Sequence, residues 1–236
     1  MTLTDLKNSW VDEPDYHKQI HESFCEKVNA DAVLKEHRDW VEQNVFGFGE
    51  RSFWWLWKLI CDELPDDPNM LEVGVFKGAT LSLWQKLKPF ANVWGVSPMN
   101  GVGTGWTGDD YWEHLNTIYK KFNSDLVYIK LPLIVQGYSA DEEVIERARR
   151  EYDVAYIDGD HSYEGALADL TTYAPMVKSG GFLVVDDAAC STHQPFGYFQ
   201  GIEPVCKALD EWLQTDIAKE FEFVANVIHI MVYRRK

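Results

Sequence analysis

From residue 69 onward, short apolar runs alternate with stretches that repeat apolar residues at helical spacing, and this alternation restricts the fold more than any other feature. The runs predict buried strands, and the stretches between them predict helices. The expected strands are 69–76, 92–97, 131–139, 153–160, 180–189, 221–227 and 228–236. The expected helices between them are 78–87, 141–152, 163–177 and 203–216. The pattern predicts an α/β fold with a mostly parallel sheet, helices on both faces, and ligands bound beyond the carboxyl ends of the strands.

Two segments lie outside this alternation. Residues 1–45 are polar and carry apolar residues at near-helical spacing, which predicts one or two amphipathic helices. Residues 97–125 are rich in glycine at first and then helical, and a loop of this size is usually a lid or a binding surface. We therefore expect an N-terminal helical extension or lid at 1–45 and a main domain at 46–236, with an insert at 97–125. The apolar residues of the first segment are Trp10, Tyr16, Ile20, Phe24, Val28 and Val33.

The charge of the chain limits its partners. With 38 acidic and 22 basic side chains the formal net charge is −16, whereas proteins that bind nucleic acids usually present a basic face. The most apolar stretch, 52–60, contains Lys58 and is shorter than a membrane span, and the first residues lack a signal-peptide pattern. We therefore expect a cytoplasmic protein that binds neither nucleic acid nor membrane.

The cysteines give no structural motif. Cys25, Cys61, Cys190 and Cys206 are widely spaced and form no Cys-x-x-Cys pair. We therefore expect reduced thiols, with neither a zinc site nor a disulfide framework.

A glycine-rich turn, "LEVGVFKGATL", links the first expected strand to its helix. Gly74 and Gly78 let the backbone approach a ligand closely, and the helix N-terminus offers free N–H donors. The turn lacks the Lys-Ser/Thr of a phosphate-binding loop and the GxGxxG of a dinucleotide-binding turn, and Glu72 would repel a pyrophosphate. A ligand with an amino group and a carboxylate fits better, and a tight turn without any ligand is the alternative.

Acidic residues and one histidine follow two of the expected strands. Asp158 and His161 lie in "AYIDGDHSYEGALADL", and Asp186 with Asp187 ends the next strand. Neighbouring parallel strands end at one edge, so the three carboxylates should converge there and repel one another unless a cation neutralises them. Oxygen ligands without cysteine or a histidine pair favour Mg²⁺, Mn²⁺ or Ca²⁺ over Zn²⁺. His161, with an ordinary pKa of ~6.5, is close enough to accept a proton from a hydroxyl group bound to the same metal.

Each of these residues also has an ordinary structural interpretation. Asp160 is a helix N-cap candidate, Asp186 or Asp187 alone could cap a turn, and a lone histidine such as His161 is usually a surface or core residue. Their coincidence on one sheet edge, beside the glycine-rich turn, favours a functional site.

Glu72, Gly74 and Gly78 resemble the first motif of the class I methyltransferases that use S-adenosyl-L-methionine. The resemblance implies a Rossmann-like fold with a seven-stranded sheet and S-adenosyl-L-methionine as cofactor. In that family the glycine turn abuts the methionine part of the cofactor, and Thr80 stands where a hydroxyl can hold its carboxylate. Ser97 stands where the family tends to have an acidic residue on the ribose, so the chain departs from the pattern there.

Other cofactor contacts follow from the same resemblance. Asp109 or Asp110 in the insert could replace the ribose contact expected at Ser97. Ser139, in "GYSADEEV", resembles the adenine-binding corner of the family, while a helix cap by Ser139 or Asp141 is the alternative.

The acidic cluster is similar to the metal site of divalent-metal-dependent O-methyltransferases, among them catechol and sugar enzymes. That family places one metal carboxylate after the fourth strand, a pair after the fifth, and a general base three residues beyond the first ligand. Asp158, then Asp186 with Asp187, then His161 match this layout. The base is a lysine in the catechol enzymes and can be a histidine in the sugar enzymes. The resemblance covers residues 50–236 and implies methylation of a hydroxyl on a sugar, glycan or natural product.

The resemblance assigns a role to each candidate residue. His161 and Asp158 are the expected catalytic residues, and Asp158, Asp186 and Asp187 the expected ligands of Mg²⁺, or of Mn²⁺ or Ca²⁺ in its place. The expected cofactor-binding residues are Glu72, Gly74, Gly78, Thr80, Ser97, Ser139 and Asp158.

Three other functions stay open: a catechol or phenol O-methyltransferase, a metal-dependent hydrolase or hydroxylase-like relative, and a non-catalytic binding protein on the same fold. Aromatic residues of the insert and the N-terminal segment could stack on a sugar, or merely pack a lid. They are Trp106, Tyr111, Trp112, Trp10 and Tyr16. The aromatic-rich N-terminal segment also suggests a homodimer.

Overall fold

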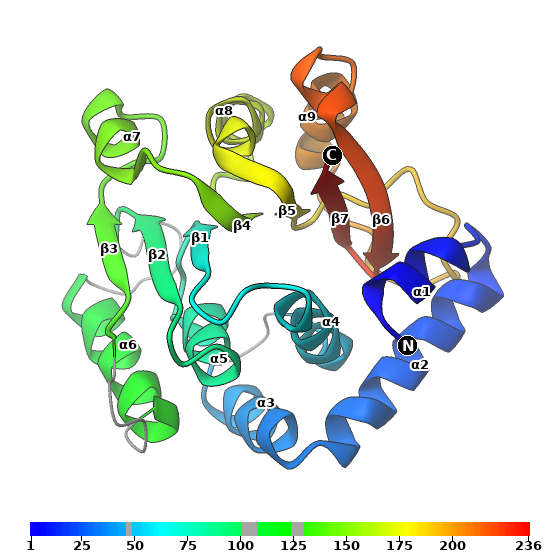
Figure 1. Ribbon diagram of the computed structural model, residues 1–236, viewed down its shortest axis with the longest axis horizontal. Helices are drawn as coiled ribbons and strands as arrows, with labels where there is room; N and C mark the ends of the chain where they lie inside the picture. Colours follow the sequence, from blue (N-terminus) through cyan, green and yellow to red (C-terminus); the bar gives the residue numbers. More distant parts are fainter. Residues whose placement is uncertain (46–48, 101–107, 124–129) are drawn as a thin grey trace.

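The computed structural model describes residues 1–45, 49–100, 108–123 and 130–236, without the side chains of residues 108 and 109. Within these ranges seven strands form one sheet in the order β3-β2-β1-β4-β5-β7-β6 (Figure 1). β1 to β5 run parallel, while β7 is antiparallel to both β5 and β6. The predicted seven-stranded, mostly parallel sheet is confirmed. The strands are β1 (Asn69–Val73), β2 (Asn92–Ser97), β3 (Leu133–Gln136), β4 (Tyr152–Ile157), β5 (Val177–Val185), β6 (Phe221–Val227) and β7 (Ile230–Arg235).

The centre of the sheet sets the position of the acidic residues. Every residue of β4 is buried, as expected for a parallel strand that helices cover on both faces. Val73 of β1 pairs with Ile157 of β4, and Ile157 pairs with Val185 of β5, so the three strands end at the same level. Asp158 and Asp186 follow directly and are therefore carried to one edge of the sheet.

Helices cover both faces of the sheet and create two cores (Figure 1). Side chains of a strand alternate between the faces, so Tyr156 and Val184 join the core under α4 to α6, while Ala155 and Leu183 join the core under α7 to α9. No helix in the described part of the chain has the length and apolar character needed to cross a membrane. These elements are α4 (Arg51–Asp62), α5 (Ala79–Leu87), α6 (Gly108–Asn123), α7 (Glu142–Ala148), α8 (Tyr163–Tyr173) and α9 (Glu203–Trp212), with short 3₁₀ helices at Ala174–Met176 and Ile217–Glu220.

Three helices form the N-terminal segment, where one or two were expected. Asp31 separates the second from the third, because its side chain accepts hydrogen bonds from the N–H groups of Val33 and Leu34 (3.0 Å each) and so caps the third helix. The second helix packs against α4, and the first packs against β6. A lid function for this segment stays a prediction. The helices are α1 (Leu3–Asn8), α2 (Pro14–Ala30) and α3 (Ala32–Asn44).

The N-terminal segment also holds the loop that follows β5. Asp12 accepts a hydrogen bond from the backbone N–H of His193 (2.8 Å), and its second carboxylate oxygen lies 2.8 Å from Nδ1 of the same residue. Nε2 of the buried His17 lies 2.7 Å from Asp12. Lys7 of α1 forms an ion pair with Glu222 of β6 (2.7 Å). The N-terminal segment therefore contacts both the loop after β5 and strand β6.

A disulfide joins Cys190, in the loop after β5, to Cys206 of α9. The expectation that all four cysteines are reduced thiols is therefore wrong for this pair. The two lie 16 positions apart, a spacing that matches no cysteine motif, and it is the fold that brings their Cα atoms to 5.9 Å. Cys25 and Cys61 are free.

Candidate functional site

The glycine-rich turn after β1 packs directly against the end of β4. Gly74 has a φ of +97°, and a Cβ there would overlap the carbonyl oxygen of Asp158. Gly78, the N-cap of α5, has a φ of +72°, and a Cβ there would overlap Leu115 of α6. Glycine is therefore needed at Gly74, where a Cβ would meet backbone, and is favoured by its positive φ at Gly78, where the side chain of Leu115 can shift. The turn and the acidic edge of the sheet form one continuous site.

Glu72 is buried in β1, next to this turn. Burial raises the pKa of its carboxyl well above the usual range, and the charge of Asp158 raises it further, while a hydrogen bond with Thr80 opposes the rise. Among the described residues, neither Oε2 of Glu72 nor the buried hydroxyl of Tyr119, from α6, has a hydrogen-bond partner. A buried acceptor in this state suits a ligand that brings its own N–H or O–H donor.

Two serines predicted to bind the cofactor are engaged by the chain itself. Ser97 is buried, and its hydroxyl donates to the carbonyl oxygen of Val75 (3.0 Å) and accepts from the N–H of Met99 (3.2 Å). The side chain of Ser139 lies beside Asp169 of α8 and opposes the rise that burial causes in the pKa of that carboxyl. The ribose and adenine contacts of these serines stay predictions.

The structure describes only some of the candidate residues in the insert and in the segment before α7. Trp106 and the side chain of Asp109 fall outside the described residues, and Asp110 is exposed in the first turn of α6. The N-cap of α7 is Asp141, although its side chain makes no capping hydrogen bond.

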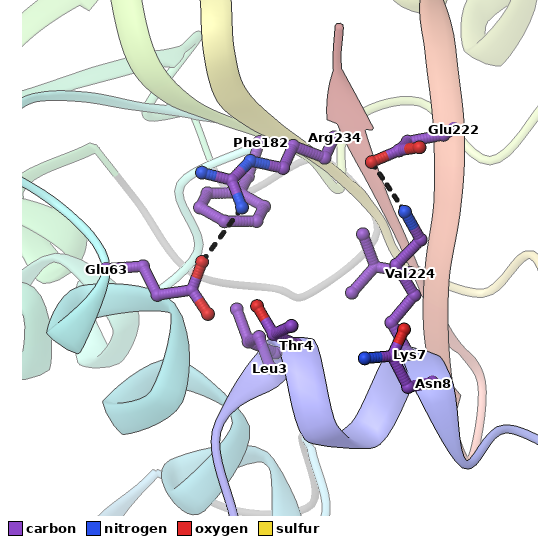
Figure 2. A pocket seen from close by; sticks show the side chains of 9 residues that line it. All are labelled: Leu3, Thr4, Lys7, Asn8, Glu63, Phe182, Glu222, Val224 and Arg234. Carbon is purple, nitrogen blue, oxygen red and sulfur yellow. Dashed lines mark hydrogen bonds and ion pairs between the residues drawn. The ribbon is translucent and has the colours of Figure 1, made fainter.

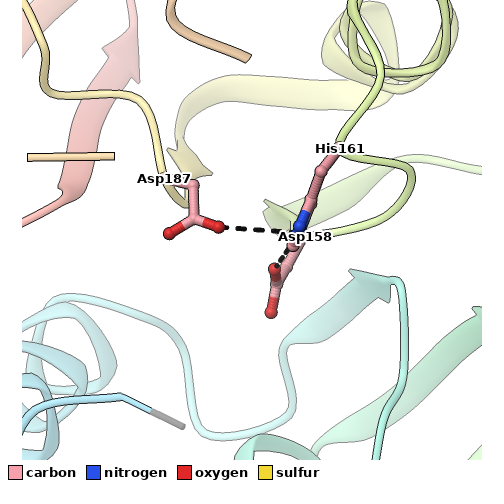
Figure 3. A group of neighbouring side chains, drawn as sticks. All are labelled: Asp158, His161 and Asp187. Carbon is pink, nitrogen blue, oxygen red and sulfur yellow. Dashed lines mark hydrogen bonds and ion pairs between the residues drawn. The ribbon is translucent and has the colours of Figure 1, made fainter. Parts of the chain in front are cut away.

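The three predicted carboxylates meet at the sheet edge, each close to a histidine. In one group, Nε2 of His161 lies 3.4 Å from Oδ1 of Asp158 and 3.6 Å from Oδ2 of Asp187 (Figure 3). In the other, Nδ1 of His229 lies 2.9 Å from Oδ1 of Asp186 and 2.9 Å from Oδ1 of Asp187. Within each group the ligand atoms lie within 4.8 Å of one another, and Asp187 belongs to both. Each group of close ligand atoms thus includes a histidine.

Burial and mutual repulsion shift the pKa values of the cluster. Burial, followed by the charge of Asp186, raises the pKa of Asp158 to about 7. Burial opposes the ionisation of Asp186, but the adjacent imidazole of His229 and a hydrogen bond from Tyr156 (2.7 Å) outweigh it and hold its pKa below the usual range. The hydrogen bond with Asp158 raises the pKa of His161. Burial opposes protonation of His229, yet its two carboxylate neighbours raise its pKa to about 10.

A positive imidazole therefore stands between two carboxylates, in the electrostatic role that a divalent cation would take. Sequence reasoning does not single out His229, which lies between β6 and β7 in the apolar run "VANVIHIMV". The available signal is one titratable side chain inside an otherwise apolar hairpin. This signal does not predict that His229 meets Asp186 and Asp187, because that contact depends on the position of β7 beside β5 in the sheet.

Close packing fixes the backbone of Asp187. Its φ of +52° lies in the left-handed region that residues other than glycine rarely adopt. Its carbonyl oxygen accepts from the N–H of Ile202 (2.9 Å), and a Cβ at Gly201 would overlap that oxygen. The N–H of Ala188 donates to the carbonyl oxygen of His229 (3.0 Å). The strained residue is thus held from two sides, as is common at functional sites.

The described aromatic candidates are mostly packing residues. Trp10 packs edge-to-face on Tyr16 (5.5 Å between ring centroids) and on Phe223 of β6 (5.3 Å). Tyr111 is buried in α6, whereas Trp112 is exposed. These contacts favour the interpretation of the N-terminal aromatics as packing residues over a sugar-stacking wall.

A pocket of ≈ 220 Å³ lies elsewhere, between α1, the end of α4 and strands β5 to β7 (Figure 2). Its charged side chains are paired: Arg234 lies 3.0 Å from Glu63, and Lys7 lies 2.7 Å from Glu222. None of its lining residues belongs to the acidic edge or to the glycine-rich turn. The pocket is therefore not part of the candidate site.

A sheet of this strand order, with a glycine turn after β1 and carboxylates after β4 and β5, has the features of a Rossmann-like transferase fold. A family model described as a methyltransferase domain matches residues 71–188, half of the chain. The chain therefore belongs to this methyltransferase family. The match runs from β1 through the glycine turn to the residue after the acidic pair, and it confirms the predicted resemblance to the methyltransferases.

Two curated proteins are similar in sequence. Uncharacterized protein R132 of Acanthamoeba polyphaga mimivirus is 28% identical over 162 residues, which cover 66% of this chain and 67% of that protein. A rhamnosyl O-methyltransferase of Mycobacterium leprae is 27% identical over 107 residues, which cover 42% of this chain and 45% of that protein. The chain thus matches less than half of the second relative's length.

Solved structures share the fold. CalS11, a TDP-rhamnose 3′-O-methyltransferase of calicheamicin biosynthesis, has a TM-score of 0.56 at 14% identity, covering 96% of this chain and 97% of that one. MycE from the mycinamycin pathway, in complex with Mg and SAH, has a TM-score of 0.52 at 16% identity, covering 80% of this chain and 51% of that one. At these identities the likeness shows the fold alone.

Proposed function

We propose that this methyltransferase transfers the methyl group of S-adenosyl-L-methionine to a hydroxyl group of a sugar, glycan or natural product, with a divalent metal ion at the acidic edge. One observation carries the proposal: the backbone at Gly74, in the glycine turn, touches the backbone at Asp158, where the acidic edge begins. A cofactor on the turn and an acceptor at the edge would therefore lie side by side, as in-line transfer between them requires.

The donor half of the proposed site is formed by Glu72, Gly74, Gly78 and Thr80. Oε2 of Glu72 is buried without a hydrogen-bond partner among the described residues, and the amino group of the cofactor would supply the missing donor. Thr80 lies beside Glu72 in the first turn of α5. The free N–H groups of the helix offer donors for a carboxylate, and the hydroxyl of Thr80 would join them by exchanging its hydrogen bond with Glu72 for one to the ligand.

The acceptor half is formed by the acidic edge. Asp158, Asp186 and Asp187 supply hard oxygen donors whose repulsion a divalent cation would neutralise, so their chemistry fits Mg²⁺ or Mn²⁺. Such an ion, when bound, lowers the pKa of a hydroxyl group that it coordinates. The side chain of His161 is 45% exposed, and its Nε2 lies within 3.6 Å of two of the carboxylates, so an acceptor can reach the imidazole. His161 accepts the proton that the hydroxyl releases.

The proposed acceptor class rests on the relatives. The names of the Mycobacterium leprae protein and of CalS11 place rhamnose in their substrates. A histidine at the position of the base agrees with a sugar acceptor. Assembly as a homodimer stays a prediction, which light scattering of the purified chain tests.

Calorimetry and a methyl-transfer assay test the proposal. We expect S-adenosyl-L-methionine to bind, and methyl transfer to TDP-rhamnose to require Mg²⁺ or Mn²⁺. His161→Ala should lower the transfer rate by about 10²–10⁴-fold, whereas the control His193→Ala, an exposed histidine of the loop after β5, should not. A chain that binds the metal but not the cofactor would contradict methyl transfer and favour a hydrolase-like relative.

A further inference from the structure

His229 occupies the second group of ligand atoms at the acidic edge. Its Nδ1 lies 2.9 Å from Oδ1 of Asp186 and 2.9 Å from Oδ1 of Asp187. The exposed fractions of His229, Asp186 and Asp187 are 8%, 9% and 7%. The three polar groups therefore meet inside the protein rather than in solvent.

Hydrogen bonding does not account for this arrangement. Among the described residues, neither Nδ1 of His229 nor Oδ1 of Asp186 takes part in a hydrogen bond of acceptable geometry, although the two atoms lie 2.9 Å apart. Buried polar atoms in proteins nearly always have a hydrogen-bond partner, and each exception needs a physical reason such as a bound ion. The ion pair between the two atoms balances their charges but leaves their hydrogen-bonding capacity unused, and an ion bound by both atoms would use it.

The two distances fit a pair of ligands on one ion as well as they fit an ion pair. Two ligands at right angles on an ion with bonds of about 2.1 Å lie about 3.0 Å apart, and both Nδ1–Oδ1 distances of 2.9 Å fit this value. We propose, resting on the metal-dependent function proposed above, that Nδ1 of His229 is a direct ligand of the divalent ion. Asp186 and Asp187 contribute one carboxylate oxygen each to the same ion.

The surrounding structure fixes the imidazole in this position. The rings of Phe53 and Phe199 pack edge-to-face on it, with centroids at 4.9 and 5.0 Å. Ile228, the residue before His229, has a φ of +52°, and the amide of Asn226 donates to its carbonyl oxygen (2.7 Å). The packing of these rings and the strained turn before His229 hold the imidazole in one orientation.

A nitrogen ligand changes which ion the site prefers. Mg²⁺ and Ca²⁺ take oxygen ligands in proteins, whereas imidazole suits transition metals. With an imidazole beside two carboxylates, the site takes divalent first-row metal ions, Mn²⁺ among them, ahead of Mg²⁺. The imidazole ligand therefore favours a divalent transition-metal ion over Mg²⁺ and Ca²⁺ at this site.

Pulsed electron paramagnetic resonance of the Mn²⁺-loaded chain tests the ligand directly, because a coordinated nitrogen gives a coupling that oxygen ligands do not. We expect this coupling in the unchanged protein, its loss in His229→Gln, whose amide binds metals through oxygen, and its retention in His161→Ala. The inference is overturned by an unchanged protein without the coupling, by a coupling that survives His229→Gln, or by its loss in His161→Ala.

Binding affinities separate this inference from the proposed function. In calorimetry, His229→Gln and His229→Ala should lower the affinity for Mn²⁺ by at least about 10–100-fold, which is what the loss of an outer-shell partner costs, and the affinity for Mg²⁺ less. Thermal melting of the metal-free variants checks that they fold. Equal losses for both ions would make the histidine merely structural and overturn the inference. Mn²⁺ binding that depends on Asp186 but shows no nitrogen coupling refutes the inference and leaves the proposed function intact. Mn²⁺ binding that survives Asp186→Asn refutes both.

Discussion

Replacing Gly74 by alanine should destabilise the protein in two separable ways. The φ of +97° disfavours any side chain, at a cost of about 1–2 kcal/mol. The added Cβ would also overlap the carbonyl oxygen of Asp158, and forcing extra volume into a packed site costs about 1–3 kcal/mol more. The expected loss of unfolding free energy is therefore about 2–5 kcal/mol, and a chain of this size should lose about 2–4 °C in Tm per kcal/mol.

A matched control variant separates the cost of the overlap with Asp158 from the cost of the backbone conformation. Gly180, in β5, has a similar φ of +82°, but a Cβ there meets nothing within 4 Å. Gly180→Ala should therefore lose only the backbone part, about 1–2 kcal/mol. Urea unfolding of both variants without ligands measures the difference. If Gly74→Ala were no less stable than Gly180→Ala, the turn would not press on the end of β4, and the adjacency of the two half-sites would be refuted.

Three further predictions follow from the cluster and the disulfide. Because the folded pKa of His229 is about 10 against an ordinary 6.5, its contribution to the stability of the metal-free protein is complete below pH 6.5 and is lost as pH rises through 10. Denaturant unfolding should show a shallower decline from pH 7 to 10 in His229→Gln, and identical slopes would contradict the ion pair. Removal of divalent ions with EDTA should abolish methyl transfer while binding of S-adenosyl-L-methionine persists, and added Mn²⁺ should restore transfer; full activity in EDTA would contradict metal dependence. The double variant Cys190→Ser/Cys206→Ser should lose about 3 kcal/mol of unfolding free energy, since the disulfide closes a loop of 16 residues, whereas Cys25→Ser should not; equal stability would argue against the disulfide.

The sheet was predictable because its signal is local. β2 and β6 begin and end at the residues expected from their apolar runs, 92–97 and 221–227. Asp158 and the pair Asp186–Asp187 follow the buried runs of β4 and β5, so a parallel pairing of those strands brings them together without further information.

The missed features depend on contacts between distant segments. His229 joins the acidic pair only because β7 enters the sheet between β5 and β6, an order that no local pattern specifies. The bond between Cys190 and Cys206 needs α9 to dock behind the loop after β5. The family resemblance implies a cofactor contact at Ser97, which stays a prediction, and the use of its hydroxyl by Val75 and Met99 becomes visible only in three dimensions.

The place of β7 between β5 and β6 ties the position of His229 to a single strand register. Val185, the residue before Asp186, pairs with Met231, two residues after His229. A slip of one residue in this antiparallel pair would turn every side chain of β7 to the opposite face of the sheet. Whether the imidazole faces the two carboxylates is therefore decided by the alignment of β7 on β5.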